Sequence, residues 1–389
     1  MEQLRMYING EWVESVSKET FATINPATTE VLAHVPRGKK EDIDLAVKAA
    51  RAAFESVEWR EMLPAERGRI LNKVAQMIRE QKDELARLET LDTGKPLSQA
   101  YTDVEVAARY FEYYAGVADK ILGETIPVRA DILNYTVREP LGVTAHIVPW
   151  NYPIQIMARS LAPALAAGNT AVVKPAEDTP LTALRLADIC EKAGIQKGVV
   201  NVVTGYGTEA GAALASHPDI DHITFTGSVS TGISVMKAAA ENVKPVTLEL
   251  GGKSPNIVFA DADLEEAAQW VVRSITQNAG QTCSAGARLL VERSIHESFT
   301  ARVTELMKNM RVGPGMENYD IGPIISEKQL KRIESYIEIA HQENALIRTG
   351  GKRACEAGKG FFFEPTVIDR VSTKSRLANE EIFGPVLFV

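Results

Sequence analysis

Two segments near the start of the chain carry apolar side chains at helical spacing. Residues 41–56 and 64–90 repeat them every three or four positions, which predicts amphipathic helices. Residues 101–120 follow the same spacing but are rich in aromatic side chains. The preceding residues 7–36 predict short strands and turns, because breakers such as Asn25-Pro26 interrupt the apolar runs there.

Short apolar strands alternate with helices in the middle of the chain, between residues 143 and 252. The predicted strands are 144–150, 170–174, 199–204, 222–226 and 246–250. One helix is predicted over 154–167, and another begins at Thr179-Pro180 and ends before Gly194. This alternation indicates a parallel sheet covered by helices on both faces. Ligands bind such sheets at the carboxyl ends of the strands, where we therefore look for chemistry.

The last part of the chain continues the α/β pattern more loosely. A strand is predicted over 289–291 and helices over 295–310 and 326–342, the latter opened by a Ser326…Gln329 capping box. The sequence stops at Val389 inside an apolar run without a terminating signal. We therefore expect a chain that is truncated in a core strand.

Residues 122–138 differ from the segments on either side. β-branched residues flank a turn around Ala130-Asp131, which predicts a β-hairpin. A surface hairpin without a functional role is the alternative interpretation.

Composition narrows the class of protein. The 389 residues are 45% hydrophobic and carry a net charge of −8. Domains of about 100–200 residues predict two or three of them. Without a Lys/Arg run, a nucleic-acid-binding face is not expected. The cysteines, Cys190, Cys283 and Cys355, have no paired spacing, so we expect neither disulfides nor a metal site, and we expect a reducing, cytoplasmic location.

Polar residues follow two of the predicted strands directly. Asn151, after the first strand, could point its amide into a cleft and stabilise an oxyanion, although taken alone an Asx-turn that caps the next helix is the preferred interpretation. Lys174 and Glu177 follow the next strand and could hold the hydroxyls of a ribose. A surface ion pair is the alternative for these two residues.

Two glycine-rich segments also follow strands. Residues 205–211 miss the spacing of the dinucleotide fingerprint by one position and are a weak signal. Gly227 and Ser228 stand between a strand and a helix, where free backbone N–H groups could bind a phosphate. A plain strand-to-helix turn remains the alternative.

Glu249 and Cys283 are the candidates for acid–base and nucleophilic chemistry. Glu249 lies in an apolar strand, where a desolvated carboxyl would suit a general base; a solvent-facing Glu on an edge strand is the alternative. Cys283 is surrounded by small polar residues, as a reactive thiol requires, although a lone cysteine is more often structural.

Taken together, in order and spacing, these motifs resemble the aldehyde dehydrogenase superfamily, from about residue 5 to Val389. The resemblance implies that Cys283 is the nucleophile, Glu249 the general base and Asn151 the oxyanion-binding residue. It implies cofactor contacts at Trp150, Lys174, Glu177, Gly227, Ser228, Glu381 and Phe383. NAD is the expected cofactor because of Glu177, with NADP as the alternative.

The resemblance also implies an architecture and a reaction. We expect a Rossmann-type cofactor domain over 1–121 and 139–248, an oligomerisation hairpin over 122–138, and an incomplete catalytic domain over 249–389. The expected reaction oxidises an aldehyde to an acid through a Cys283 thiohemiacetal and thioester, with hydride transfer to NAD(P)+. The expected partners are a small aldehyde and further copies of the chain, as a dimer or tetramer, without nucleic acid or membrane.

The substrate is less well defined by the sequence. Tyr152, Arg159 and Gln277 are the predicted substrate-side residues. Arg159 occupies a position that resembles the carboxylate-binding arginine of semialdehyde dehydrogenases, and its guanidinium could pair with an acidic tail. Gln277 stands where those enzymes carry a second arginine. An Arg packed against the tunnel wall is the alternative.

Two other functions fit the same motifs. A CoA-acylating aldehyde dehydrogenase would transfer the thioester to a thiol, but such members commonly lack the base at the position of Glu249. A non-catalytic, cofactor-binding fragment of the family is the second alternative, which the expected truncation keeps open.

Overall fold

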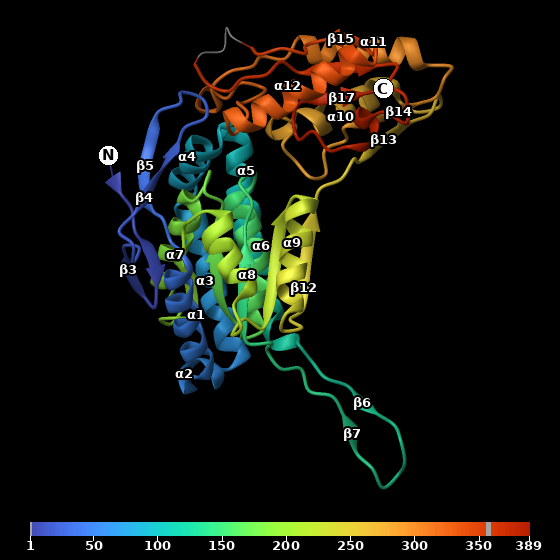
Figure 1. Ribbon diagram of the computed structural model, residues 1–389. Helices are drawn as coiled ribbons and strands as arrows, with labels where there is room; N and C mark the ends of the chain where they lie inside the picture. The colour runs from blue at the N-terminus through green and yellow to red at the C-terminus, as the bar shows by residue number, and fades with distance from the viewer. Residues whose placement is uncertain (1, 355–358) are drawn as a thin grey trace. The chain divides into compact units, whose positions relative to one another are not determined.

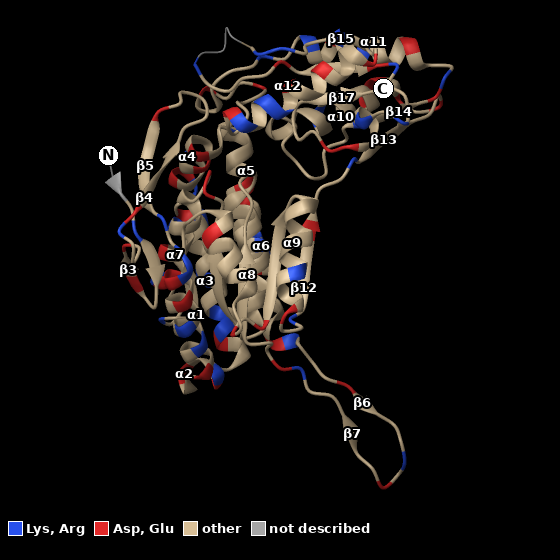
Figure 2. Cartoon of the chain, in the orientation of Figure 1, with Lys and Arg blue, Asp and Glu red and all other residues tan. Residues whose placement is uncertain are grey.

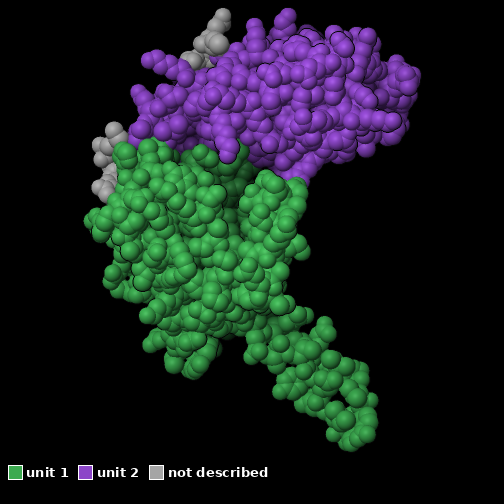
Figure 3. Space-filling model, viewed as in Figure 1, with its two compact units in different colours: residues 1–23, 33–88, 101–249 green, residues 24–32, 89–100, 250–389 purple. Residues whose placement is uncertain are grey.

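Residues 2–354 and 359–389 are described by the computed structural model of the chain. They form two compact units, coloured separately in Figure 3. Unit 1 consists of residues 1–23, 33–88 and 101–249, and unit 2 of residues 24–32, 89–100 and 250–389. Cys355 lies outside the described residues.

Unit 1 is built on a sheet of seven strands within the described residues, in the order β12-β11-β8-β9-β10-β2-β3. These strands are β2 (Met6–Ile8), β3 (Glu11–Val13), β8 (Val143–Ile147), β9 (Thr170–Lys174), β10 (Val200–Val202), β11 (His222–Gly227) and β12 (Val246–Leu250). The neighbours of β8 and β9 pair in parallel, with Thr144 opposite Ala171 and His222 opposite Thr144. The first four predicted strands of this region are therefore confirmed as one parallel core, and the fifth forms β12 at its edge.

The order of the strands reverses beside β8. The chain adds β9 and β10 on one side of β8 and then returns to add β11 and β12 on the other. At such a reversal the connections leave the sheet in opposite directions and open a crevice at the strands' carboxyl ends. The loops after β8 and β11 are therefore the place where unit 1 can bind a ligand.

Helices cover both faces of this sheet, since all five residues of β9 are buried. In one group, α1 contacts β9, α9 contacts β11, and α8 packs on α1 and α9. In a second group, α6 and α7, backed by α3, contact β8 to β10. The helices of unit 1 are α1 (Lys40–Glu55), α2 (Val57–Arg60), α3 (Pro64–Glu80), η1 (Ala118–Lys120), α6 (Pro153–Ala166), α7 (Leu181–Ala193), η2 (Gly207–Gly211), α8 (Ala212–Ser216) and α9 (Val229–Ala240). Helices α4 (Lys82–Thr93) and α5 (Leu97–Val117) each have one end in segment 89–100.

The predicted hairpin forms between β6 (Thr125–Ile126) and β7 (Asn134–Tyr135), with Thr125 opposite Tyr135. It extends away from the body of unit 1 in Figure 1, and residues 121–141 are exposed throughout. Near the N-terminus, β1 (Glu2–Gln3), β5 (Val31–Pro36) and β4 (Thr20–Ile24) form a small sheet in that order.

Unit 2 contains a second sheet, in the order β13-β14-β17-β16-β15. Its strands are β13 (Pro255–Val258), β14 (Arg288–Val291), β15 (Leu346–Thr349), β16 (Thr366–Asp369) and β17 (Val386–Phe388), and its helices are α10 (Leu264–Thr276), η3 (Gln277–Gly280), α11 (His296–Lys308), η4 (Gly315–Glu317), α12 (Glu327–Gln342) and α13 (Arg376–Asn379). Successive residues of β16 and β17 enter different cores, because side chains alternate across a strand. Val367 and Leu387 pack with α10 and α11, whereas Ile368 and Phe388 pack with α12.

Three local predictions need correction in detail. The helix predicted over 64–90 is divided at Gln81 into α3 and α4. Helix α7 begins at Leu181, because Pro180 is its N-cap rather than its first residue. The capping box of α12 forms only in part: the hydroxyl of Ser326 accepts from the Gln329 N–H, but the Gln329 side chain donates elsewhere.

Acidic and basic residues are mixed along the helices visible in Figure 2. Within residues 2–354 and 359–389, the structure contains no helix that is long and apolar enough to cross a membrane.

A buried carboxylate ties α11, β15 and β16 together in unit 2. Asp369 is fully buried and accepts hydrogen bonds from Arg348 Nε at 2.8 Å and His296 Nε2 at 3.0 Å. The other nitrogens of Arg348 hold Glu297 at 2.8 and 2.7 Å. His296, Glu297 and Asp369 are close enough to hold a metal ion, but Arg348 already supplies the positive charge among them. This cluster is a structural ion-pair network.

This network predicts a loss of stability in acid. Burial alone raises the pKa of Asp369, but the hydrogen bonds from Arg348, the Arg370 N–H and His296 outweigh it and hold the pKa below its ordinary value. The contribution is therefore complete above the unfolded-state pKa of about 3.9 and is lost as the pH falls through the folded-state value. Asp369→Asn should lower stability at neutral pH by about 1–3 kcal/mol and flatten the acid limb of urea midpoint against pH.

The control for this substitution is Asp320→Asn, which removes an exposed carboxylate beside Arg311 in the same unit. That change should leave the urea midpoint close to that of the wild type. Equal midpoints for the two variants at all pH values would contradict the role given to Asp369.

Candidate active site

The loop after β8 carries the first predicted site residues of unit 1. Trp150, Asn151 and Tyr152 join β8 to α6, which begins at Pro153. Asn151 is only 5% exposed, and Thr179 donates its hydroxyl to the Trp150 carbonyl at 3.2 Å. The predicted oxyanion-binding residue therefore stands at the strand-order reversal, on backbone that is tied to the segment after β9.

Lys174 and Glu177, which follow β9, form an ion pair in which only Lys174 is buried. Lys174 is 2% exposed, and its Nζ lies 2.9 Å from Glu177 Oε2. Burial alone raises the pKa of Glu177, but the charge and hydrogen bond of Lys174, with the Gly207 N–H, lower it below its ordinary value. The glycine-rich segment 205–211 is thus brought beside the pair. A Cβ built on Gly207 would meet open space, so a ligand could approach its backbone.

Gly227 ends β11, and Ser228 is the N-cap of α9. The Ser228 hydroxyl accepts from the Thr231 N–H at 3.3 Å. The 12-residue helix α9 thus starts at the carboxyl edge of the sheet, where its N-terminal N–H groups could accept the phosphate oxygens of a dinucleotide.

Glu249 is placed differently from the sequence expectation. Strand β12 is the edge of its sheet, and the Glu249 side chain is 54% exposed rather than desolvated. Its Oε2 lies 3.7 Å from Arg159 Nη1 on α6. Arg159 also donates from Nη2 to the Thr226 hydroxyl at 3.1 Å. The alternative of a solvent-facing Glu on an edge strand is the one that the structure favours.

A cavity of about 420 Å³ lies beside this pair, entirely within unit 1. Arg159 and Ser160 of α6 line one side, and residues of β8, β11 and β12, including Glu249, line the other. The predicted base therefore lines a cavity within its own unit.

Cys283 lies in unit 2 and is exposed, as a reactive thiol requires. The loop that carries it follows α10 and has an unusual backbone. Asn278, Ala279 and Gly280 have φ of 49°, 54° and 72°, and all three are buried. Left-handed backbone at a non-glycine residue costs roughly 1–2 kcal/mol, so surrounding contacts must stabilise this turn.

Side-chain amides supply part of that stabilisation. Gln281 is 1% exposed, donates from Nε2 to the Asn278 carbonyl at 3.0 Å and accepts the Ile325 N–H at 2.9 Å. The Asn278 N–H donates a hydrogen bond to Gln99 Oε1 at 2.9 Å. These bonds hold the backbone before Cys283 at both ends of the turn.

The third contact is between two backbones. A Cβ on Gly280 would collide with the carbonyl of Gly384, so only glycine allows this approach. Gly384 belongs to segment 381–385, which was predicted to lie on the nicotinamide side. Gln329 of α12 donates to the carbonyls of Ile382 and Phe383 at 3.0 and 2.9 Å. The nucleophile loop and this segment are therefore brought together within unit 2.

A small cavity of unit 2 is lined by Glu381 and Lys253, together with Thr282 and Phe383. Glu381 Oε1 accepts the Gly252 N–H at 3.4 Å, and burial raises its pKa despite the nearby charges of Arg332 and Lys253. Burial, with the charge of Arg288, lowers the pKa of Lys253 to about 7. The Lys253 ammonium lies 4.0 Å from the centre of the Phe388 ring, a cation–π contact.

The remaining predicted residues differ in their burial and in the unit to which they belong. Cys190 is buried in α7, where burial raises the pKa of its thiol to about 12, so it is inert. Gln277, a predicted substrate contact, is exposed at the end of α10 in unit 2, whereas Tyr152 and Arg159 belong to unit 1.

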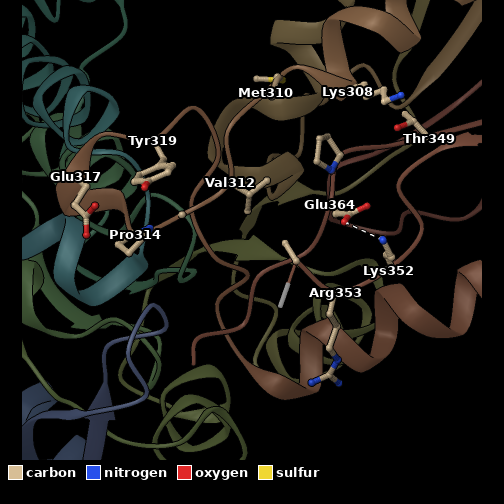
Figure 4. A pocket seen from close by; sticks show the side chains of 13 residues that line it. Lys308, Met310, Val312, Pro314, Glu317, Tyr319, Thr349, Lys352, Arg353 and Glu364 are labelled. Carbon is tan, nitrogen blue, oxygen red and sulfur yellow. Dashed lines mark ion pairs between the residues drawn. The ribbon is translucent and has the colours of Figure 1, made fainter. Parts of the chain in front are cut away.

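A second cavity in unit 2, of about 800 Å³, contains none of the predicted residues (Figure 4). Three of the charged residues in its lining form ion pairs. Lys352 lies 3.6 Å from Glu364, and Arg353 binds Glu334 at 2.6 Å and Glu327 at 2.9 Å. We assign no chemistry to it.

Comparison with known proteins decides the family. The model of the aldehyde dehydrogenase family matches residues 12–389. The chain belongs to the aldehyde dehydrogenase family. It is 48% identical to aldehyde dehydrogenase 1 of Tanacetum cinerariifolium, over 99% of this chain and 77% of that protein. A betaine aldehyde dehydrogenase of Bacillus subtilis is 46% identical, over 99% of this chain and 79% of that protein.

Solved aldehyde dehydrogenases have the same fold. The NAD+ complex of the Bacillus cereus enzyme superposes with a TM-score of 0.98 at 48% identity, covering 100% of this chain and 79% of that one. A betaine aldehyde dehydrogenase of Staphylococcus aureus with NAD+ gives 0.97 at 44% identity, covering 99% and 77%. The predicted family, the α/β fold and the enzyme class, an NAD-dependent aldehyde dehydrogenase, are confirmed.

The sequence did not indicate the roles of three further residues in this site. Gly280 and Gln281 hold the nucleophile turn, and Lys253 lies in the cavity beside Glu381. The sequence Asn278-Ala279-Gly280 contained a usable signal, because Asn and Gly tolerate left-handed backbone better than other residues. Burial of Lys253 depends on long-range packing and left no local signal.

The contact between Gly280 and Gly384 predicts a strong effect of one methyl group. Gly280→Ala places a Cβ against the Gly384 carbonyl at positive φ, so it should lower stability by about 1–3 kcal/mol and change the alkylation rate of Cys283. Thermal unfolding and iodoacetamide labelling measure the two effects. Gly116→Ala is the control, because a Cβ there meets open space on helix α5. Identical behaviour of the two variants would contradict the proposed constraint.

Proposed function

We propose that this chain oxidises an aldehyde to its carboxylic acid with NAD+, using Cys283 as the nucleophile. The observation that supports it best is the exposed Cys283 thiol, next to a buried left-handed turn that packs against segment 381–385. Such a turn stores strain that the surrounding structure must overcome, which is common at functional sites. Membership of the aldehyde dehydrogenase family gives this cysteine its chemistry.

The proposed reaction has two covalent stages. The Cys283 thiolate attacks the aldehyde carbon, and the Asn151 amide and the Cys283 N–H stabilise the oxyanion that forms. When bound, NAD+ supplies the hydride acceptor that turns the thiohemiacetal into a thioester. Glu249 then removes a proton from water, which attacks the thioester and releases the acid and the thiolate.

The residues of unit 1 suit a dinucleotide. Lys174 and Glu177 would hold the adenosine ribose beside the open backbone of Gly207, and Gly227, Ser228 and Trp150 would surround the pyrophosphate. Glu177 carries a carboxylate that would repel a 2′-phosphate, so we expect a preference for NAD+ over NADP+. In unit 2, Glu381 and Phe383 would contact the ribose and ring of the nicotinamide.

The substrate class remains a proposal from the sequence. Tyr152, Arg159 and Gln277 are the proposed substrate contacts, and an acid semialdehyde is the proposed class because of Arg159. Its guanidinium is already engaged with Glu249 and Thr226, so an acidic tail would have to share it.

Assembly, domain roles and location are also proposals. We expect unit 1 to bind cofactor, unit 2 to carry catalysis and the exposed hairpin at 122–138 to join copies into a dimer or tetramer. A cytoplasmic location rests on cysteine usage alone, and relatives are named both cytosolic and mitochondrial.

The test is NADH formation with a panel of aldehydes. Cys283→Ala should reduce turnover about a thousandfold or more, because no other group can form the thioester. Cys190→Ala removes the buried thiol of α7 and is the matched control that should keep turnover. Turnover by Cys283→Ala at the control's rate would overturn the proposal. Acid release that depends on added CoA would instead indicate the acylating type.

A further inference from the structure

Polar side chains occupy one face of three neighbouring strands in unit 1. A buried parallel sheet normally presents apolar residues on both faces. Here the residues that line the 420 Å³ cavity alternate along β8, β11 and β12: Thr144, His146, His222, Thr224, Thr247 and Glu249. A breach of the ordinary pattern at this scale indicates a functional surface.

Most groups on this face are neutral or bound to each other. His146 is buried, and burial, with the charge of His222, lowers its pKa to about 3. Its Nε2 lies 2.9 Å from the Thr144 hydroxyl. Burial also lowers the pKa of His222, whose Nε2 lies 3.1 Å from the Thr247 hydroxyl. Neither histidine therefore brings a positive charge to the cavity at neutral pH.

Arg159 is the residue that brings that charge. It belongs to the rigid helix α6, and its side chain is 34% exposed. The Thr226 hydroxyl accepts from Nη2 at 3.1 Å, which leaves Nη1 directed at Glu249 Oε2, 3.7 Å away. Glu249 is by contrast 54% exposed and lies on an edge strand.

We propose that Arg159 is a positioning residue for Glu249. The guanidinium, anchored on Thr226, holds the carboxylate on the α6 side of β12 and so limits the conformations from which it removes a proton from water. This inference rests on the proposed function, because it assigns Glu249 to thioester hydrolysis. It differs from the proposed substrate contact, because here Arg159 acts on every aldehyde alike.

The two stages of the reaction allow the proposed function and the positioning role of Arg159 to be tested separately. Formation of the thioester at Cys283 releases one NADH per site and does not need Glu249. Hydrolysis needs Glu249 and sets the steady rate when it is slow. Rapid mixing of protein, NAD+ and an uncharged aldehyde should therefore show a burst of NADH followed by steady turnover.

Arg159→Met should leave the burst intact and lower the steady rate. An ion pair of this exposure couples weakly, so we expect a decrease of about two- to fivefold. Arg159→Lys should recover part of the rate, since it keeps the charge. In a Glu249→Gln background, Arg159→Met should have no further effect, because its partner is gone.

The matched control is Arg185→Met. Arg185 is also in unit 1, on α7, with 32% side-chain exposure and carboxylate partners Glu84 and Asp188. It should leave burst and steady rate unchanged. Repeating the series with an acid semialdehyde then tests the other role: a loss confined to that substrate would overturn positioning and make Arg159 a substrate contact.

Failure of the proposal and failure of the proposed function are distinguishable. Absence of any NADH formation by the wild type contradicts the function, whereas a normal burst with an unchanged or faster steady rate in Arg159→Met contradicts positioning. A readout independent of turnover is carbodiimide labelling of Glu249, measured by mass spectrometry. Arg159→Met should raise that labelling rate severalfold, and Arg185→Met should not. Equal labelling rates in the wild type, Arg159→Met and Arg185→Met would show that Arg159 does not hold Glu249 and would overturn the proposal.

Discussion

The close approach of Gly280 to Gly384 organises the chemistry of unit 2. Two backbones meet where no side chain fits, and this contact joins the loop of Cys283 to the segment that contains Glu381 and Phe383. The turn at Asn278 and Ala279 is unfavourable for residues with a Cβ. Its cost is offset by the hydrogen bonds of Gln281 and Gln99 and by the burial of the turn. An exposed thiol thus stands on a loop whose backbone has little freedom.

In unit 1 the positions of the candidate site residues result from the strand topology and not from strained backbone. Because β8 and β11 are parallel, the loops after them leave the same edge of the sheet, and the reversal of strand order beside β8 opens a crevice there. Asn151 and Ser228 lie in those loops, and the pair of the buried Lys174 and the partly exposed Glu177 follows β9. Each of these positions results from a strand ending at a common edge. Arg159, which lies on helix α6, adds a positive charge beside Glu249.

The sequence predicted what depends on local pattern. Strand and helix alternation fixes the parallel core, and the motifs around Asn151, Lys174 and Cys283 identified the family before any coordinates. The prediction for Glu249 was wrong in its surroundings, because apolar neighbours along a strand do not reveal that the strand is an edge. The half-formed capping box of Gln329 has a similar cause: its amide binds carbonyls 53 and 54 residues away. Segments 24–32 and 89–100 join unit 2 through long-range contacts that no local spacing encodes.

The central claim is that the oxidised substrate is bonded to Cys283. Glu249→Gln protein mixed with NAD+ and an aldehyde, quenched in acid and analysed by mass spectrometry, tests it most directly, because hydrolysis of the thioester is slowed. The account predicts the mass of one acyl group on the peptide that contains Cys283, dependent on NAD+. NADH formation with that peptide unmodified, or an acyl group on another residue, would contradict it.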